Sequence, residues 1–266
     1  MSTLETRNMS KDYRLRDGRN SSILRAVKNV SFTLEAGKTV ALVGQSGSGK
    51  STLAKILMQL ERPTSGEILL DGRPISRHGR GLRDHRSSVQ MVFQDPFASL
   101  NPFHTVEHHL RRPLLLHHKA HDADGVRAGV RRLLERVELE PADVVAGRRP
   151  HELSGGQRQR VAIARALAPS PHVLIADEPV SMLDVSIRLG VLNLLSQLQR
   201  EENLAILYIT HDLATARHFS DEILVMFKGE IVERGPSDEV ILNPQHEYTR
   251  LLMAAAPNPE KRIARG

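Results

Sequence analysis

The sequence has no cysteine and no tryptophan, and it has only three tyrosines and six phenylalanines among its 266 residues. Without cysteine, the chain can form no disulfide, thiolate metal site or cysteine-ligated iron–sulfur cluster, so packing alone must hold the fold. So few aromatic side chains disfavour a nucleic-acid surface that stacks bases between aromatic rings.

Long hydrophobic runs are also missing. No stretch approaches the roughly 18 consecutive apolar residues that indicate a membrane-spanning helix, and the N-terminus lacks the apolar core of a signal peptide. We therefore expect a cytoplasmic protein. Its length and its 40% hydrophobic content suit one large domain with subdomains. The net charge of +6 is compatible with nucleic acid, anionic lipid or a phosphate-rich ligand, and it does not choose among them.

Short apolar runs, each of a length that suits a buried strand, alternate with stretches of helix-forming composition. The first run ends at a glycine-rich loop, and a helix is predicted directly after this loop, over 51–60. This order is typical of a parallel sheet covered by helices on both faces, so the sequence predicts an α/β core. Near the C-terminus, two more runs flank Lys228 and Gly229, which favour a tight hairpin turn. The predicted strands are 39–43, 89–93, 173–176, 205–210, 223–227 and 230–233.

The segment from about 96 to 169 has few strand-like runs and is predicted to be a mainly helical insertion in this core. Within it, one set of apolar residues recurs at spacings of three and four and marks the buried face of an amphipathic helix, whose other face is rich in arginine. These apolar residues are Val126, Val130, Leu133, Leu134 and Val137.

The strongest single motif is GQSGSGKS, from Gly44 to Ser51, which fits the pattern GxxxxGK[ST] between a predicted strand and a predicted helix. Its glycines let the backbone turn tightly, so that backbone N–H groups and the helix N-terminus surround phosphates. Lys50 is expected to reach the β- and γ-phosphates of a nucleotide, and Ser51 to ligate Mg²⁺. The alternative, a glycine-rich turn without chemistry, is disfavoured by the flanking strand and helix. The candidate nucleotide-binding residues are Gly44, Gln45, Ser46, Gly47, Ser48, Gly49, Lys50, Ser51 and Thr52.

Two acidic residues, Asp177 and Glu178, follow the predicted strand 173–176. Because ligands of open α/β sheets bind at the carboxyl ends of the strands, both carboxylates are expected on the same edge as Lys50. Asp177 is the expected Mg²⁺ partner, and Glu178 is placed to orient or deprotonate an attacking water. Acidic residues also end strands for structural reasons, particularly before a proline such as Pro179, so the pair alone leaves both interpretations open.

A second glycine motif, LSGGQ at 153–157, precedes a helix-forming stretch that continues to Leu167. A serine and two glycines at a helix N-terminus again offer N–H groups to an anion, which predicts a second phosphate-binding element. Taken alone, a plain N-cap is the simpler interpretation. The residues concerned are Ser154, Gly155, Gly156 and Gln157.

These three motifs, in this order, resemble those of ABC ATPases, and LSGGQ resembles the signature that defines that family. The resemblance covers nearly the whole chain. It implies an α/β fold with a P-loop NTPase core built on a parallel sheet, an N-terminal antiparallel β subdomain and an inserted helical subdomain at about 96–169. It also implies an ABC ATPase domain over 1–242 and a C-terminal segment over 243–266.

Further residues are similar to other elements of the family. Gln94 resembles the Q-loop glutamine, which would link Mg²⁺ to the helical insertion, Asp184 resembles the D-loop aspartate, and His211 resembles the switch histidine. Tyr13 is the candidate for the aromatic residue that stacks on adenine. Ordinary packing is the alternative for Tyr13, and the basic stretch 14–25 separates it from the next predicted strand.

The resemblance implies an ATP site shared between two subunits. Ser154 and Gly156 of one subunit would contact the γ-phosphate of the ATP held by Lys50 of the other, so neither subunit would own a complete site. Glu178 would polarise the attacking water, and His211 would hold the γ-phosphate and that water in register. The implied catalytic residues are Glu178, His211, Gln94 and Lys50, and the implied Mg²⁺ ligands are Ser51, Gln94 and Asp177.

Two stretches resemble the importers of the oligopeptide, dipeptide and nickel group. The segment 94–102 (QDPFASLNP) resembles an extended sequence of that group, and 243–252 (NPQHEYTRLL), followed by Ala256 and Pro257, resembles its C-terminal module. Glu247 stands where the usual pattern has proline. The implied function is ATP hydrolysis, with ATP and Mg²⁺, that powers import of peptides or a related small solute.

The resemblance also implies the partners and the location. The partners would be two membrane permease subunits, a second ATPase subunit that is a homologue or a second copy, and, indirectly, an extracellular solute-binding protein. The chain would lie peripherally on the cytoplasmic face of the cell membrane. The transported solute stays open, because in this family the permease and the receptor select it.

Six histidines gather between residues 104 and 121, and some relatives in the importer group import nickel. His104 and His108 have the i,i+4 spacing of helical metal ligands, but an arginine pair and Pro113 interrupt the segment, and carboxylate ligands are scarce. A structural role is the favoured interpretation, because helical spacing alone is weak evidence for metal. The six are His104, His108, His109, His117, His118 and His121.

Three rival functions share part of this pattern. An ABC ATPase that acts on nucleic acid or ribosomes would suit the net charge, but such proteins usually carry two cassettes or a long coiled-coil insertion, so no nucleic-acid partner is expected. An exporter subunit would share every ATP-site residue, and the importer-like C-terminal segment disfavours it. A P-loop ATPase of another family would lack the motif at Ser154.

Overall fold

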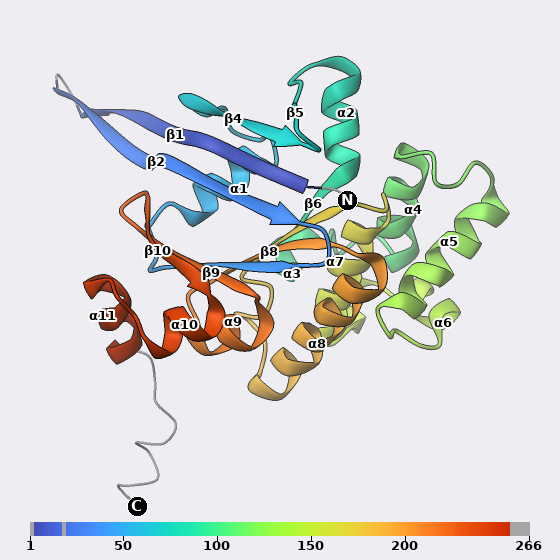
Figure 1. Cartoon of the computed structure of the whole chain (residues 1–266). Coiled ribbons are helices and arrows are strands. Elements are labelled where there is room, and N and C mark those ends of the chain that lie inside the picture. The colour runs from blue at the N-terminus through green and yellow to red at the C-terminus, as the bar shows by residue number, and fades with distance from the viewer. Residues whose placement is uncertain (1–2, 18–19, 256–266) are drawn as a thin grey trace, which may run out of the picture.

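The computed structural model describes residues 3–17 and 20–255, and the strands among these residues form two sheets, one of six strands and one of four (Figure 1). The central sheet has the order β10-β9-β3-β8-β7-β6, in which β10 is antiparallel to β9 and the other neighbours are parallel. The predicted α/β core is therefore confirmed. The strands of this sheet are β3 (Thr39–Val43), β6 (Val89–Val92), β7 (Val173–Asp177), β8 (Ala205–Thr210), β9 (Glu222–Phe227) and β10 (Glu230–Pro236).

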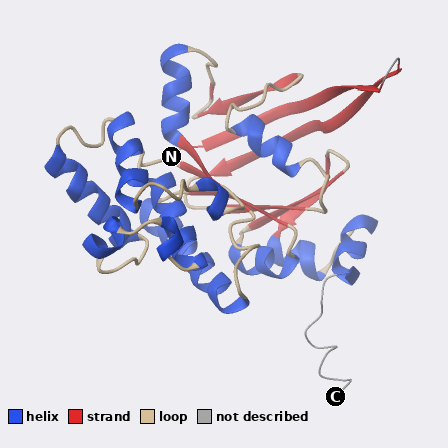
Figure 2. Cartoon of the chain, turned by 180° about the vertical axis from the view of Figure 1, so that it is seen from behind, coloured by secondary structure: helices blue, strands red, loops and turns tan. Residues whose placement is uncertain are grey.

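The second sheet is antiparallel and is built mainly from the N-terminal part of the chain, as the fold prediction requires. Its two long strands form a hairpin that extends away from the helices (Figures 1 and 2). The strands are β1 (Thr3–Asp17), β2 (Asn20–Glu35), β4 (Ser65–Leu70) and β5 (Arg73–Pro74).

This hairpin corrects one expectation. The basic stretch 14–25 was predicted to separate Tyr13 from the next strand, but its described residues, 14–17 and 20–25, belong to β1 and β2, with Tyr13 opposite Leu24 and Arg14 opposite Ile23. Apolar residues such as Ile23 suit extended strands, and pairing between the two strands satisfies the backbone N–H and C=O groups of a segment that carries many charges.

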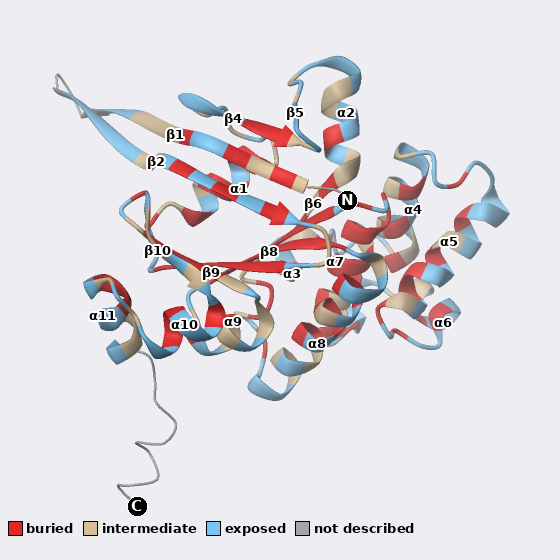
Figure 3. Cartoon of the chain, viewed as in Figure 1, coloured by how far each residue is buried: buried red, intermediate tan, exposed pale blue. Residues whose placement is uncertain are grey.

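Both faces of the central sheet are covered, which explains why its strands read as continuous apolar runs (Figure 3). Side chains alternate along β3: Val40 and Leu42 pack into the core between the two sheets, whereas Ala41 and Val43 pack into the core under the helices. Helix α1 (Lys50–Leu57) contributes to the core between the sheets. Its last helical residue lies earlier than the predicted end at residue 60.

The segment between β6 and β7 is helical throughout its regular structure, and its apolar residues pack with the core on the helical side of the sheet. The predicted amphipathic helix is α5, and its predicted apolar face is buried. The helices of this segment are α3 (Pro96–Ser99), α4 (Val106–Leu116), α5 (Ala123–Arg136), α6 (Ala142–Gly147), the 3₁₀ helix η1 (Pro150–Glu152) and α7 (Gly155–Leu167).

Helix α4 runs through Pro113, so the expectation that this proline interrupts the segment is wrong. The proline removes one backbone N–H and disfavours a helix interior. Burial of Val106, Leu110 and Leu114 on one face of α4 outweighs that local cost.

The remaining helices lie outside this insertion, and none of the helices that the structure describes combines the length and the apolar character needed to span a lipid bilayer. The hairpin predicted around Lys228 and Gly229 is confirmed: it joins β9 to β10, and both residues have positive φ, 47° and 88°. These helices are α2 (Gly79–Ser88), α8 (Val185–Glu202), α9 (Leu213–Phe219), α10 (Ser237–Leu242) and α11 (Glu247–Ala255).

Candidate nucleotide-binding site

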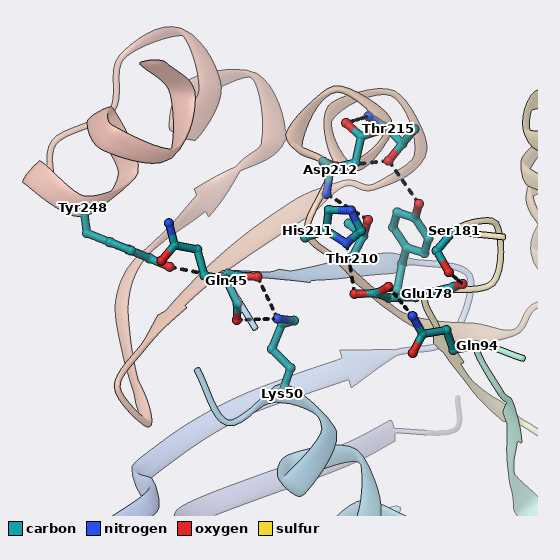
Figure 4. A network of polar contacts seen from close by, with 12 residues as sticks. Gln45, Lys50, Gln94, Glu178, Ser181, Thr210, His211, Asp212, Thr215 and Tyr248 are labelled. Carbon is teal, nitrogen blue, oxygen red and sulfur yellow. Dashed lines mark hydrogen bonds and ion pairs between the residues drawn. The ribbon is translucent and has the colours of Figure 1, made fainter. Parts of the chain in front are cut away.

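The candidate residues gather at one edge of the central sheet. Val43 at the end of β3 pairs with Thr210 at the end of β8, Asp177 pairs with Ile209, and Val92 at the end of β6 pairs with Ala176. Because these strands are parallel and in register, the residues that follow them share one edge. Figure 4 shows the result, with Lys50, Gln94, Glu178 and His211 side by side.

The glycine-rich loop after β3 packs closely against neighbouring backbone at both of its ends. A Cβ atom at Gly44 would lie 2.3 Å from the carbonyl oxygen of Met226, and one at Gly49 would lie 2.3 Å from that of Ala26. Gly49 is also the N-cap of α1, with φ 113° and no side chain to cap the helix. The first N–H groups of α1 are therefore not satisfied by an N-cap side chain, as a phosphate-binding loop requires.

The Lys50 side chain folds back over this loop. Its residue is 6% exposed, and Nζ donates to the carbonyl oxygens of Gly44 at 2.7 Å and Gln45 at 2.9 Å. Burial lowers the pKa of the Lys50 ammonium, and the nearby Glu178 and Asp177 carboxylates oppose that shift. The loop thus holds a positive charge inside the fold and close to two carboxylates.

Asp177 ends β7 in an unfavourable electrostatic position. Burial, and next the adjacent Glu178 carboxylate, raise the pKa of Asp177 to about 6, although Lys50 acts in the opposite direction. Two carboxylates beside one ammonium leave net negative charge at a half-buried point. Mg²⁺ prefers oxygen ligands and would neutralise this negative charge. The Asp177 carboxylate and the hydroxyl of the exposed Ser51, at the start of α1, therefore fit the predicted ion.

Glu178 is held between two neighbours. Its Oε2 accepts a hydrogen bond from Nε2 of Gln94 at 2.8 Å, and its Oε1 lies 3.0 Å from Nδ1 of His211 (Figure 4). Because an ionised carboxylate only accepts, Nδ1 carries the hydrogen in the second contact. The backbone of Glu178 has φ 45°, which is uncommon for a residue other than glycine and is typical of functional positions. A row of three polar residues thus spans the ends of β6, β7 and β8.

The second glycine motif lies at the N-terminus of α7. Ser154 forms a capping box, in which its Oγ accepts from Gln157 N at 3.2 Å and Gln157 Oε1 accepts from Ser154 N at 3.0 Å. A Cβ at Gly156 would lie 2.6 Å from a methyl carbon of Ile187, so glycine lets α7 approach α8 closely. Ser154 is exposed, and within the described residues no hydrogen bond joins 153–157 to the loop 44–51.

Two other candidates stand apart from this row. Asp184 is exposed at the N-cap of α8, and its side chain caps no backbone N–H there. Tyr13 lies half-buried on β1 with the Lys11 ammonium 4.8 Å from its ring centroid. The adenine-stacking role of Tyr13 stays a prediction.

The sequence analysis did not predict two contacts between this loop and the C-terminal part of the chain. The hydroxyl of Tyr248 accepts from the backbone N–H of Gln45 at 3.0 Å, and Gly229 N donates to the carbonyl oxygen of Ser48 at 2.9 Å. Tyr248 lies within the segment 243–252 that resembles the importer module, but no local signal indicated which of its residues meets the loop.

Some of the clustered histidines line a groove of about 1000 Å³ between β6 and α4. The rings of His104 and His108 stack at 3.9 Å between centroids, and His109 Nε2 lies 3.1 Å from the carbonyl oxygen of Asn101. Burial lowers the pKa of His109. Within the described residues, no group of three or more potential ligands is arranged to hold a metal ion. We call this pocket the insertion groove; its lining includes Phe93, Gln94, His104, His108, His109, Arg112 and Arg165.

A glycine-rich loop at the carboxyl edge of a parallel sheet, paired acidic residues at the end of β7 and a second glycine-rich helix start with an exposed serine are features of an ABC ATP-binding cassette. The ABC transporter family model matches residues 27–181, and the chain belongs to this family.

Curated relatives include import proteins. The chain is 48% identical to the glutathione import ATP-binding protein GsiA of Salmonella typhimurium over 96% of this chain, but it spans only 41% of that relative's length. It is 45% identical to the oligopeptide transport ATP-binding protein AppF of Bacillus subtilis, over 97% of this chain and 79% of the relative. It is also 45% identical to the di/tripeptide transport ATP-binding protein DppF of Pseudomonas aeruginosa, over 96% of this chain and 79% of the relative.

Solved structures support the same fold. An ATP-binding cassette solved as a dimer in a post-hydrolysis state with ADP and Pi has a TM-score of 0.77 and 32% identity, covering 88% of this chain and 98% of that one. A component of the cbiONQ ABC transporter complex of Clostridium perfringens has a TM-score of 0.79 and 28% identity, covering 98% of both chains. The P-loop NTPase fold predicted from the motifs is confirmed.

Proposed function

We propose that this chain hydrolyses ATP to power import of peptides or a related small solute through a separate membrane permease. The observation that carries the ATPase proposal is the Glu178 carboxylate, held between Gln94 and His211 at the edge where Lys50 lies. The peptide-type substrate rests on the relatives, whose names refer to glutathione, oligopeptides and di- or tripeptides.

In this proposal the loop and the acidic pair divide the chemistry. Lys50 and the N–H groups of the loop bind the β- and γ-phosphates, and Ser51, Gln94 and Asp177 supply oxygen ligands for Mg²⁺. The bound ion would neutralise phosphate charge. Glu178 accepts a proton from the attacking water, and its two neighbours orient the carboxylate for that task.

The exposed N-terminus of α7 supports a site completed by a second ATPase subunit. Ser154 is exposed, and within the described residues no hydrogen bond joins its motif to the chain's own phosphate loop, so a γ-phosphate presented by a partner would be free to bind there. The dimeric state of a structural relative is consistent with this arrangement. The partner is a homologue or a second copy, and Asp184 and Gln157 would lie in the same interface.

The insertion groove is the proposed docking place for the permease. It begins beside Gln94 and continues along α4, so a shift of Gln94 on ATP binding would reach it. Exposed Phe93 and Phe97, 44% and 50% exposed, and Phe103, 82% exposed, lie near it on a chain with few aromatic residues. This proposal places the chain on the cytoplasmic face of the cell membrane, with two permease subunits and, indirectly, a solute-binding protein.

We also propose a division into an ATPase domain over 1–242, with the helical insertion at about 96–169, and a C-terminal segment over 243–266. The segment is described to residue 255, and its helix α11 reaches the phosphate loop through the hydroxyl of Tyr248. Ala256 and Pro257, which completed the resemblance to the importer module, lie outside the described residues.

A cell that makes this chain from its own gene tests the proposal. Deleting the gene should abolish uptake of labelled di- and tripeptides, and the purified chain should release phosphate from ATP in the presence of Mg²⁺. The chain should also be recovered with solubilised permease subunits. Normal peptide uptake in the deletion strain would contradict the importer assignment, and absence of phosphate release both alone and in the assembly would contradict the ATPase assignment.

A further inference from the structure

Helix α11, near the C-terminus, reaches the phosphate loop through one side chain. The hydroxyl oxygen of Tyr248 accepts a hydrogen bond from the backbone N–H of Gln45 at 3.0 Å, across 203 positions of sequence (Figure 4). The carbonyl oxygen of the same residue, Gln45, accepts from Nζ of Lys50 at 2.9 Å. Gln45 is therefore held on both sides, by the C-terminal helix and by the lysine that faces the phosphates.

The tyrosine is itself fixed in place. Its residue is 6% exposed, and its ring stacks on Phe227 with centroids 4.1 Å apart and an angle of 28° between the rings. Its backbone N–H donates to His246 Nδ1 at 3.1 Å. The chain just before α11 is tied to β10, where the Glu233 carboxylate accepts from the N–H groups of Gln245 and His246 at 2.7 and 3.0 Å. The hydroxyl thus reaches the loop without a further cost for ordering its side chain.

The loop needs such a support. Gly44, Gly47 and Gly49 give this short segment large conformational freedom, which ordering the loop must remove. The second half of the loop is tied to the β9–β10 turn by the bond from Gly229 N to Ser48 O. The first half carries the exposed residues Gln45 and Ser46, and the hydrogen bond from Tyr248 restrains it.

We propose that Tyr248 is a positioning residue for ATP: its hydroxyl holds Gln45, and through Gln45 the Lys50 ammonium, in the conformation that binds phosphate. The ring and the hydroxyl have separate tasks. Stacking on Phe227 fills the core, and phenylalanine would preserve it, whereas among the described residues the hydroxyl's hydrogen-bond partner is the phosphate loop. This inference rests on the proposed ATPase function and extends it to the C-terminal segment.

The test compares Tyr248→Phe with Thr249→Val in the full chain. Each variant removes one hydroxyl from neighbouring buried positions of α11, but Thr249, 0% exposed, has no hydrogen bond to the loop within the described residues. Dissociation constants for a fluorescent ATP analogue, kcat and KM for ATP, and the Tm of the nucleotide-free protein are measured for both. Tyr248→Phe should raise the dissociation constant and KM about two- to tenfold, the range for one lost hydrogen bond, and leave kcat within about twofold. Thr249→Val should leave both binding values unchanged.

A second variant removes the donor in place of the acceptor. Gln45→Pro deletes the N–H group that Tyr248 holds. Whatever Gln45→Pro does alone, adding Tyr248→Phe to it should cause no further rise in the dissociation constant, because the bond is already absent. Additive effects of the two substitutions would overturn the inference.

Two other results would also overturn it. Wild-type affinity in Tyr248→Phe, or an equal loss in Thr249→Val, would mean that the hydroxyl contributes only to general packing, even if Tm falls. In both cases the wild-type chain still binds ATP and the proposed function stands. A wild-type chain that binds no nucleotide would instead remove the proposed function and the inference together.

Discussion

The N-termini of α1 and α7 have the same local chemistry and opposite surroundings. Both begin within glycine-rich motifs, GQSGSGKS at α1 and LSGGQ at α7. Around α1, the loop is packed under Met226 and Ala26, held by Tyr248 and Gly229, and faces two carboxylates. Around α7, Ser154 is exposed and satisfies its own helix by a capping box.

This difference assigns different tasks to the two helices. The site at α1 has what binding needs within one chain: a lysine, acidic residues for a cation and a fixed loop. The site at α7 has N–H groups and the positive end of a helix dipole, but the first turn of α7 contains no acidic residue that would balance this positive end. Substitutions at the α1 site should therefore change nucleotide binding by a single subunit, and substitutions at α7 should change association with a partner subunit and the turnover that depends on it.

The largest effect is expected at Glu178. Glu178→Gln keeps the size of the side chain and its reach toward Gln94 and His211, but it removes the group that accepts a proton, so turnover should fall about 10²–10⁴-fold with ATP binding retained. Because bound ATP then persists, an ATP-dependent dimer should accumulate in light scattering. Wild-type turnover of this variant within the assembled transporter would show that Glu178 is not the base.

Lys50→Ala should come next in size. It removes the ammonium that faces the β- and γ-phosphates, and ATP turnover by the isolated chain should fall about 10²–10³-fold, as for loss of a preorganised electrostatic group. Lys55→Ala is the matched control, because Lys55 lies five residues further along the same helix and its side chain has no hydrogen bond to the loop backbone within the described residues. Equal losses in the two variants would contradict the assignment of this loop.

At α7, Ser154→Asp and Ser154→Asn separate charge from capping. Both are good N-cap residues, so α7 should keep its N-terminus, but only the aspartate carboxylate repels a phosphate. ATP-dependent association should weaken about tenfold or more in Ser154→Asp relative to Ser154→Asn. Nucleotide binding by the isolated chain should be unchanged in both. Equal association of the two variants would contradict the composite site.

The smallest effect concerns stability at the α1 site. The pKa of Asp177 is raised to about 6, so the folded state binds the proton of this carboxyl more tightly than the unfolded state does. The free energy of unfolding should therefore decrease as pH rises from the usual carboxyl range through about 6. Asp177→Asn removes the carboxyl group and with it the loss of stability on its ionisation, and it should stabilise the nucleotide-free, Mg²⁺-free protein by about 1–3 kcal/mol at pH 8. The gain should shrink to roughly half at pH 5, where folded Asp177 is mostly protonated. Chemical denaturation at both pH values measures this; a gain that grows as pH falls would contradict it.

The most local features were predictable from the sequence. The short strand-like run before Gly44, with four consecutive apolar residues, predicted β3, and the loop after it predicted the start of α1. Ser154 with the two glycines that follow it predicted the start of α7. Each depends on interactions between residues that are close along the chain, such as strand alternation, capping and glycine turns. Such interactions act the same way in most surroundings.

Features that depend on neighbours far along the chain were missed or wrong. Residues 14–17 extend β1 and residues 20–25 extend β2 because the two segments pair with each other. Helix α4 continues through Pro113 because its buried face outweighs the cost of the proline. Tyr248 was within a recognised segment, yet its contact with Gln45 depends on where α11 packs against the sheet.

The sequence by itself determined the glycine-rich loop between β3 and α1, the acidic pair at the end of β7, the start of α7 and the class of fold, because each follows from patterns of neighbouring residues with one favourable local structure. Only the tertiary structure decided that Gln94, Glu178 and His211 form one hydrogen-bonded row, that Ser154 faces outward, and that Tyr248 supports the loop. The physical reason is that strand order, sheet register and helix packing set distances between segments far apart in the chain, and these follow from burying the whole core at once.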